Sequence, residues 1–138
     1  MQDNPNPDKL THTADKLRWY RYNKSLLQRE VAEHAGIDRS TYIHYECAEH
    51  DYYPIEKLKR IAELFEVDVT ELLDDYNRFL YEGQGRQIRK IRKDMGLTQY
   101  QFGKLHGVSA GAVKRWENGK VRMSKETWER LIPNKSPT

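Results

Sequence analysis

The stretch that decides the fold lies at residues 95–120 and reads MGLTQYQFGKLHGVSAGAVKRWENGK. Thr98 can cap a helix, and Gln101 three residues later completes a capping box. Gly107 tolerates the positive φ at which helices commonly end, and Ser109 can cap a second helix directly after it. The spacing therefore predicts two short helices about a tight glycine-containing turn, which is a helix-turn-helix.

The two predicted helices each have an apolar face. Phe102 and Leu105 are three residues apart, so they share a face that we expect to be buried. Lys114 and Arg115 fall on the outward face of the second helix, which the Asn-Gly pair at 118–119 ends. The inward positions of that helix are apolar: Ala112, Val113 and Trp116.

The order of these residues resembles the signature of the Cro/phage-repressor (Xre-like) family of DNA-binding domains. The resemblance runs from Gly96-Leu-Thr-Gln through Gly107-Val-Ser to Trp116-Glu-Asn-Gly, so it is long and specific. It implies an all-helical fold and binding to double-stranded DNA, with the second helix of the motif in the major groove.

Composition excludes several classes of protein. The chain has 138 residues, of which 33% are charged, and no apolar run approaches the ~20 residues of a membrane helix. The first nine residues lack the apolar core of a signal peptide. Cys47 is the one cysteine, which excludes an internal disulfide and fits a reducing cytoplasm. We therefore expect a cytoplasmic protein with no contact to a membrane.

The charge is unevenly distributed. Residues 15–82 hold 10 basic and 15 acidic side chains, whereas residues 83–138 hold 13 basic and 4 acidic ones. The positive field that attracts phosphates is thus concentrated in the C-terminal part.

The chain contains an internal repeat. Shifted by 71 residues, the N-terminal half aligns with the motif, and several residues are identical. The identical pairs are Arg18 with Arg89, Arg21 with Arg92, Leu26 with Leu97, Gln28 with Gln99, Gly36 with Gly107, and Glu46 with Glu117. The sequence therefore predicts two tandem lambda-repressor-like helix-turn-helix units in an all-α chain of about nine helices.

Domain boundaries follow from composition and periodicity. Residues 1–13 are polar and predicted to be a disordered tail. Residues 14–82 form the first unit, with helices over 14–24, 26–35 (capped by Ser25) and 39–47, a fourth from Pro54, and a fifth running continuously from Val69 past Leu80. Residues 83–138 form the second unit, beginning where Gly83-Gln84-Gly85 breaks that helix. Its helices include 86–94 and 124–131, and it has no fifth helix.

The second unit must have a small core, which is marginal unless it docks on something. The predicted core residues are Ile88, Ile91, Leu97, Phe102, Leu105, Val108, Val113, Trp116, Trp128 and Leu131. The end of the fifth helix is apolar, and we expect it to pack on the second unit or on a partner chain through Tyr76, Phe79, Leu80 or Tyr81.

The family resemblance implies which residues of the second unit meet DNA. Gln99 braces the phosphate backbone, while Ser109, Ala110 and Gly111 face the base edges. The remaining contacts are one turn further along, or in the basic stretch that closes the helix: Lys114, Arg115, Asn118, Lys120 and Arg122. Arg115 is the predicted base reader, with a phosphate contact as the alternative.

The matching positions of the first unit are Gln28, Arg39, Ser40, Thr41 and His44. Arg39 has the fork geometry that guanine accepts. Glu49, however, stands where the second unit has Lys120, and a like charge there opposes phosphate binding. The two observations conflict, so the sequence leaves open whether the first unit contacts DNA.

Other chemistry finds little support. His44, Cys47 and His50 have a spacing of three, but a structural zinc site usually needs four ligands. No nucleophile elbow or phosphate-binding glycine loop is present, so we expect neither enzyme activity nor a cofactor, metal or small-molecule ligand. Two functions remain: a sequence-specific transcription regulator, or a protein-interaction or antitoxin-like module with secondary DNA binding and a homodimeric or other protein partner.

Overall fold

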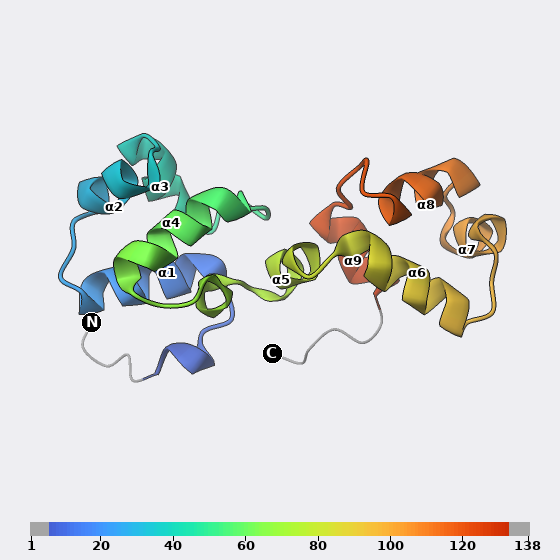
Figure 1. The fold of residues 1–138 in the computed structure, drawn as a ribbon, viewed down its shortest axis with the longest axis horizontal. Helices are drawn as coiled ribbons and strands as arrows, with labels where there is room; N and C mark the ends of the chain where they lie inside the picture. Colours follow the sequence, from blue (N-terminus) through green and yellow to red (C-terminus); the bar gives the residue numbers. More distant parts are fainter. Residues whose placement is uncertain (1–5, 133–138) are drawn as a thin grey trace. The chain divides into compact units, whose positions relative to one another are not determined.

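A computed structural model describes residues 6–132, and every regular element within that range is helical (Figure 1). The chain divides into two compact units, one ending at Arg78 and the other beginning at Phe79. Nine α-helices and two 3-10 turns occur in the described range. The predicted all-α fold with two tandem units is confirmed. None of these helices is both long and apolar enough to cross a membrane.

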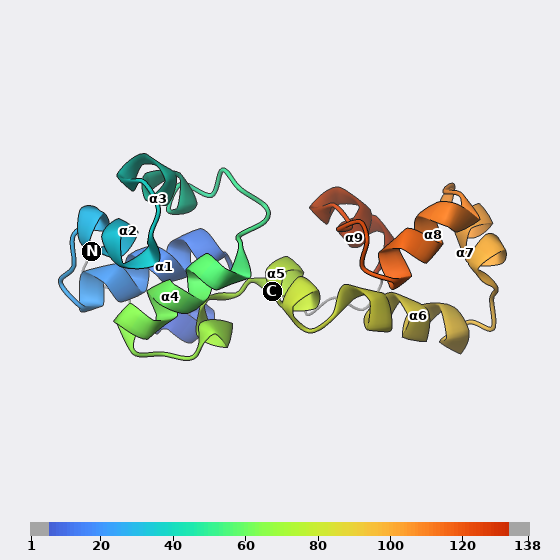
Figure 2. The ribbon, with the colours of Figure 1, turned by 45° about the horizontal axis from the view of Figure 1, so that its top comes forward.

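The first unit contains four α-helices and both 3-10 turns. In chain order they are η1 (Pro7–Lys9), α1 (Thr13–Asn23), α2 (Gln28–Ala35), α3 (Arg39–Tyr45), α4 (Ile55–Phe65) and η2 (Val69–Leu72). In Figures 1 and 2, α2 and α3 lie side by side, with α1 and α4 below them. The core lies between these helices, where Leu17, Val31, Tyr42, Ile61 and Phe65 are fully buried.

The second unit repeats the arrangement with fewer residues. Its helices are α6 (Gln84–Asp94), α7 (Gln99–His106), α8 (Ala110–Glu117) and α9 (Lys125–Leu131), while α5 (Asp75–Tyr81) spans the boundary at residues 78–79. The buried apolar residues are Phe79, Ile88, Phe102, Val113, Trp116, Met123, Trp128 and Leu131.

The turn between α7 and α8 has the predicted local chemistry. The Thr98 hydroxyl accepts a 3.1 Å bond from the Gln101 backbone N–H, and the Gln101 side chain accepts a 2.9 Å bond from the Thr98 N–H. Gly107 ends α7 with φ 74°, and Gly36 ends α2 with φ 73°. Both units therefore close their first motif helix with a left-handed glycine.

The predicted continuous fifth helix is wrong. η2 ends at Leu72, and Leu73 is extended, with φ −87° and ψ 133°. The Leu73 carbonyl accepts a 2.8 Å bond from the Lys16 ammonium, and the Asp74 N–H donates to the Thr13 hydroxyl at 3.0 Å. These bonds hold the backbone out of the helix, so α5 is a separate element.

The hydrogen bond from the Asp74 N–H to Thr13 also bears on the predicted N-terminal tail, which was drawn too long. Thr13 is 1% exposed and belongs to α1, and Pro7–Lys9 forms a 3-10 turn capped by Asn6. The first five residues of the predicted tail lie outside the described range. The second helix also starts later than predicted, at Gln28, because Ser25 has φ 55° and Leu27 takes the N-cap position.

The break between α5 and α6 is shorter than the sequence indicated. Only Glu82 and Gly83 lie between the two helices, Gly83 with φ 106°, whereas Gln84 and Gly85 lie inside α6. The apolar end of α5 is divided as well. Phe79 belongs to the second unit and its ring lies 6.1 Å from that of Trp128, while Tyr81 is 43% exposed.

One predicted core residue is not in the core. Leu105 is 58% exposed, although its partner on the same helix face, Phe102, is buried. Ile91, Leu97 and Val108 are only partly buried. Met123, in the loop before α9, takes part in the core instead and was not predicted.

Candidate nucleic-acid interface

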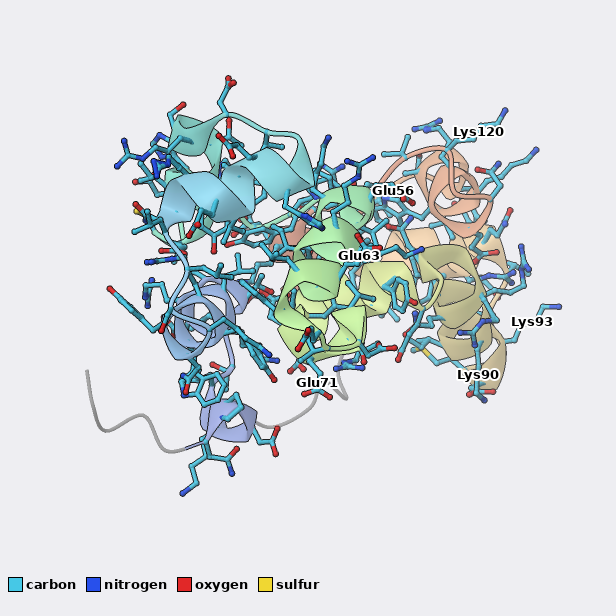
Figure 3. All side chains as sticks on the ribbon, turned by 60° about the vertical axis from the view of Figure 1, so that its left-hand side comes forward. Glu56, Glu63, Glu71, Lys90, Lys93 and Lys120 are labelled. Carbon is cyan, nitrogen blue, oxygen red and sulfur yellow. The ribbon has the colours of Figure 1, made fainter. Side chains whose placement is uncertain are left out.

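The outward face of α8 carries most of the residues that the sequence assigns to the second unit's DNA contact. Gly111, Lys114 and Arg115 are exposed, and Ala110 is partly exposed. Asn118, Lys120 and Arg122 follow in the loop after the helix and are exposed too. Lys120 projects outward in Figure 3. The structure thus places the exposed basic residues of one helix face and the following loop in one unit, and we call Lys114, Arg115, Lys120 and Arg122 its basic surface.

Two of the predicted contact residues accept hydrogen bonds from nearby backbone N–H groups. The Ser109 hydroxyl accepts a 3.0 Å bond from the Ala112 N–H and so caps α8. The Asn118 side chain accepts a 3.0 Å bond from the Lys120 N–H, which shapes the loop. Both groups therefore position the basic surface, and Ser109 has little freedom to reach a base edge.

A buried cluster connects α8 to the two preceding helices. The Arg92 guanidinium donates two hydrogen bonds to the Glu117 carboxylate, at 2.7 and 3.1 Å. The same arginine donates to the Leu97 carbonyl at 3.0 Å, and Gln99 donates to Glu117 at 3.1 Å. We call Arg92, Gln99 and Glu117 the clamp of the second unit. It joins α6, the start of α7 and the end of α8.

The first unit contains an equivalent clamp 71 residues earlier. Arg21 donates to Glu46 at 2.6 and 3.0 Å and to the Leu26 carbonyl at 3.1 Å. Gln28 donates to Glu46 at 3.1 Å. Three of the six identical pairs that revealed the repeat therefore form the clamp, a role that the sequence alone did not reveal.

The clamp fixes the geometry that a recognition helix needs. A bidentate arginine–carboxylate pair fixes the relative orientation of the two side chains as well as the distance between them. Because Gln28 and Gln99 each give an amide hydrogen to the clamp, they hold the second motif helix against the first. The proposal that they also brace a phosphate stays a prediction.

The ionisation of Glu117 depends on the clamp. Burial opposes ionisation, but hydrogen bonds from Arg92 and Gln99 and the charges of Arg92 and Arg89 outweigh it, so the pKa of Glu117 is lowered from its ordinary 4.5. A carboxylate whose pKa is lower in the folded chain stabilises the fold above its unfolded pKa, and this contribution disappears as the pH falls through the folded pKa.

We therefore expect the second unit to lose stability as the pH falls below 4.5. In Glu117→Gln the part of this loss that comes from residue 117 should be absent, so its unfolding free energy should change less over the same pH range. Denaturant unfolding of both proteins at a series of pH values measures the difference. Equal pH slopes would show that Glu117 does not contribute.

A second buried group, Gln84, positions the basic loop. Its amide donates to the carbonyls of Trp116 and Val121, at 3.0 and 2.9 Å, and its carbonyl accepts a 2.7 Å bond from the Met123 N–H. These bonds tie both ends of the loop that carries Lys120 to the start of α6. The sequence predicted that Gln84 lies in the break after the fifth helix, so this role was missed; its position between two glycines is no signal of burial.

The corresponding surface of the first unit differs in charge. Arg39, Ser40 and His44 are exposed, but His44 lies 2.6 Å from the Glu49 carboxylate. Thr41 is half-buried. A polar groove of about 450 Å³ opens where α2 and α3 begin. It is lined by Arg21, Tyr22, Leu27, Gln28, Arg29 and Arg39.

Comparison with known proteins agrees with this arrangement. The model of a helix-turn-helix domain family matches residues 14–78, and the model of a second helix-turn-helix family matches residues 88–132. The cryptic phage CTXphi transcriptional repressor RstR of Vibrio cholerae is 30% identical over 78 residues, which are 56% of this chain and 69% of the repressor. No solved structure matches the chain.

The two matched segments contain the two helix-turn-helix motifs. Each segment also contains the arginine, glutamine and glutamate of one clamp. The chain belongs to the Cro/phage-repressor (Xre-like) family of helix-turn-helix DNA-binding transcription regulators, of which it carries two tandem copies.

Proposed function

We propose that this regulator is a cytoplasmic, non-enzymatic repressor that recognises a specific operator mainly through α8 of its second unit. The supporting observation is the basic surface on α8 and the following loop, which the clamp and Gln84 hold in place. Residues 83–138 also hold 13 of the 24 basic side chains with only 4 acidic ones. A positive field of this kind supplies most of the sequence-independent affinity for DNA.

The first unit has a supporting role in this proposal. Its groove beside Arg29 and Arg39 offers guanidinium groups at the start of α2 and α3, which suits a phosphate. The acidic side chains elsewhere on the unit, including Glu56, Glu63 and Glu71 (Figure 3), limit its long-range attraction to DNA. We infer that the first unit adds contacts once the second unit has bound.

A gel-shift assay with the full chain and the DNA upstream of its own gene tests the proposal directly. A shift that survives excess unrelated DNA supports a sequence-specific regulator. The alternative is a protein-interaction module. The observation that favours it is the pairing of His44 with Glu49, because it sets a carboxylate beside a predicted DNA contact on the first unit's outward face. Binding of equal strength to all DNA, or none at all, would favour that alternative.

The salt dependence of binding should identify the unit that meets the phosphates. Each neutralised phosphate contributes about −0.9 to the slope of log affinity against log salt concentration. The combined change of Lys114, Lys120 and Arg122 to alanine should therefore flatten the slope markedly. Arg39→Ala should change it by one such contact at most. Titrations by fluorescence anisotropy at several salt concentrations give the slopes.

Lys120→Ala is the matched single variant for Arg39→Ala, because both remove one exposed cation. If Arg39→Ala flattened the slope more than Lys120→Ala, the main phosphate contacts would belong to the first unit.

Arg115 is expected to read a base. It lies one helical turn beyond Gly111, and its Nη1 is 3.4 Å from the place where a Cβ of residue 111 would be. The guanidinium thus lies over the part of α8 that has no side chain of its own, where the helix can approach the base edges closely. A two-pronged bond to guanine is worth about 1–3 kcal/mol of discrimination.

Arg115→Ala should accordingly relax the preference at one base pair, whereas Lys120→Ala should weaken binding to all sequences alike. Selection from a randomised operator library, sequenced for both variants, separates the two effects. A uniform loss for Arg115→Ala would make Arg115 a phosphate contact.

A further inference from the structure

The loop after α8 contains an asparagine that is followed directly by a glycine, Asn118-Gly119, and the sequence has this pair once. Both residues are exposed. The backbone nitrogen after an asparagine can attack the side-chain amide, because the attack closes a five-membered ring. Glycine hinders the attack least, since it carries no side chain beside the attacking nitrogen. The composition of this loop therefore favours loss of the Asn118 amide.

The Asn118 side chain is held close to the nitrogen that would attack it. Its Oδ1 accepts a 3.0 Å bond from the Lys120 N–H, two residues further on. The ring that this bond closes contains both reacting atoms, Cγ of Asn118 and the nitrogen of Gly119. The Gly119 N–H has one backbone partner, the Trp116 carbonyl, at 3.3 Å, which is long for such a bond. The attacking group is thus close to its target and weakly held elsewhere.

The same hydrogen bond stabilises the charge that the reaction develops. When the Gly119 nitrogen attacks Cγ, Oδ1 becomes an oxyanion, and the Lys120 N–H already lies 3.0 Å from it. A backbone donor placed in advance at this distance stabilises a tetrahedral intermediate. The cations of the basic surface add a positive potential around the loop, which also favours an oxyanion.

The other asparagines in the described part of the chain each lack one of these features. Asn6 accepts a 2.9 Å bond from the backbone two residues further on, but the nitrogen that follows it belongs to Pro7 and carries no hydrogen. Asn23 is exposed, but its amide donates backwards to the Trp19 carbonyl at 2.8 Å, and a lysine follows it. Asn77 is 4% exposed, and its side chain bonds to two backbone groups of the first unit.

The first unit shows that the turn itself does not require this pair. The residues 71 positions earlier are Cys47 and Ala48, which have no amide side chain. Ala48 has φ 59° and Gly119 has φ 78°, so both loops have a left-handed backbone at this point. The fold therefore accommodates alanine where the second unit has the glycine that permits the reaction.

We propose that Asn118 is a site of spontaneous deamidation that weakens DNA binding as the protein ages. The Gly119 nitrogen loses its proton to solvent and bonds to Cγ, the bond from Cγ to the amide nitrogen breaks, and ammonia leaves. Water then opens the succinimide ring at either of its two carbonyls. The products are aspartate and isoaspartate, in which the backbone runs through the former side chain. Either product consumes one water, releases one ammonia and carries one new negative charge.

The new carboxylate lies beside the basic surface. Residue 118 is the C-cap of α8, where the helix dipole already disfavours negative charge. Lys120, which projects outward in Figure 3, follows two residues later. The carboxylate repels the phosphates that Lys120 attracts, and isoaspartate also lengthens the backbone between α8 and Lys120. The loss of affinity rests on the proposed function, whereas the chemical step does not.

Peptide mapping by mass spectrometry tests the chemical step on the full chain. During incubation in mildly alkaline buffer, Asn118 should convert faster than Asn23 in the same sample, because Asn23 is exposed but precedes a lysine. Gly119→Ala, a change that the backbone of Ala48 shows to be compatible with the turn, should lower the rate at residue 118 towards that of Asn23. Equal rates for Asn118 and Asn23 in the natural chain would overturn the proposal.

Two variants test the consequence for DNA binding. Asn118→Asp supplies one product directly, and Asn118→Ser is the matched control, because it keeps an oxygen acceptor for the Lys120 N–H and has no amide. With the DNA upstream of its own gene, Asn118→Asp should bind about fivefold more weakly than Asn118→Ser, the effect of one like charge beside a phosphate in water. Its slope of log affinity against log salt concentration should be shallower by about one phosphate contact.

Incubated samples complete the test. The natural chain should lose affinity in proportion to its converted fraction, while incubated Asn118→Ser should keep the affinity of its own fresh sample. Equal affinities of Asn118→Asp and Asn118→Ser would overturn the effect on DNA binding. If the fresh natural chain bound no DNA, the proposed function and the loss of affinity would fail together, and the peptide map alone would decide the modification site.

Discussion

Replacing Glu117 with leucine is expected to unfold the second unit while the first stays folded. The change removes the acceptor of both Arg92 bonds and of the Gln99 bond, and leaves a guanidinium that is mostly buried without its counter-charge. Breaking a buried pair in this way costs about 3–5 kcal/mol. A unit of this size has little more stability than that. Hydrogen exchange of the full chain, compared for α7 and α8 against α2 and α3, measures the effect in each unit.

Arg89→Ala is the control for this variant. Arg89 also approaches Glu117, at 3.5 Å, but its side chain is 49% exposed. An exposed pair of this kind is worth about 1 kcal/mol or less. If Glu117→Leu were as mild as Arg89→Ala, the clamp would not be what holds α8 in place.

Gly85→Ala is expected to have a comparable effect for a different reason. A Cβ at this position would lie 2.0 Å from the backbone carbonyl oxygen of Glu117. No side-chain rotation relieves a clash with the backbone, so α6 and the end of α8 would have to separate. The clamp joins the same two helices and would be stretched as well. We expect a loss at the upper end of the range for overpacking, about 3 kcal/mol.

Gly111→Ala provides the comparison. Its added Cβ would meet only the flexible end of Arg115, at 3.4 Å, and the Ser109 hydroxyl, at 3.7 Å. Alanine inside a helix is better than glycine by roughly 0.5–1 kcal/mol. This variant should therefore be slightly more stable than the natural chain. Both are compared by denaturant unfolding, and a harmless Gly85→Ala would mean that α6 and α8 are not in close contact.

The repeat makes the special role of Gly85 visible. Its counterpart in the first unit is Ala14, which is 1% exposed and has room for its methyl group. The two units therefore bring the first helix and the end of the recognition helix together at different distances. A comparison of sequence patterns registers both positions as small residues and misses the difference.

The turns were predictable because their chemistry is local. Capping side chains and left-handed glycines act within three or four residues, so Thr98, Gln101 and Gly107 could be assigned from spacing alone. The break in the fifth helix was not, because it depends on Thr13 and Lys16, which are about 60 residues away in the chain. Periodicity indicates which secondary structure a segment prefers. It gives no information on hydrogen bonds to residues that are distant in sequence.

The same limit explains why the sequence did not predict the contacts within the clamp or the exposure of Leu105. Arg21, Gln28 and Glu46 were aligned with Arg92, Gln99 and Glu117, yet nothing in the alignment says that the three side chains meet. For Leu105, helical spacing correctly placed an apolar residue on the same face as Phe102. Whether that face is covered depends on a neighbouring helix that is distant in sequence: α4 extends to Phe65, whereas α9 ends at Leu131, the counterpart of Arg60.

The contact between Phe79 and Trp128 decides where the chain can be cut. The Phe79 carbonyl also accepts a 2.8 Å bond from the Gln87 side chain, so residues on both sides of Gly83 belong to one folding unit. A fragment that starts at Gly83 would expose Trp128 and leave Gln87 with one acceptor fewer. An expression boundary drawn through the glycine, as composition suggests, would therefore yield a weakened protein and understate its affinity for DNA; the boundary belongs before Phe79.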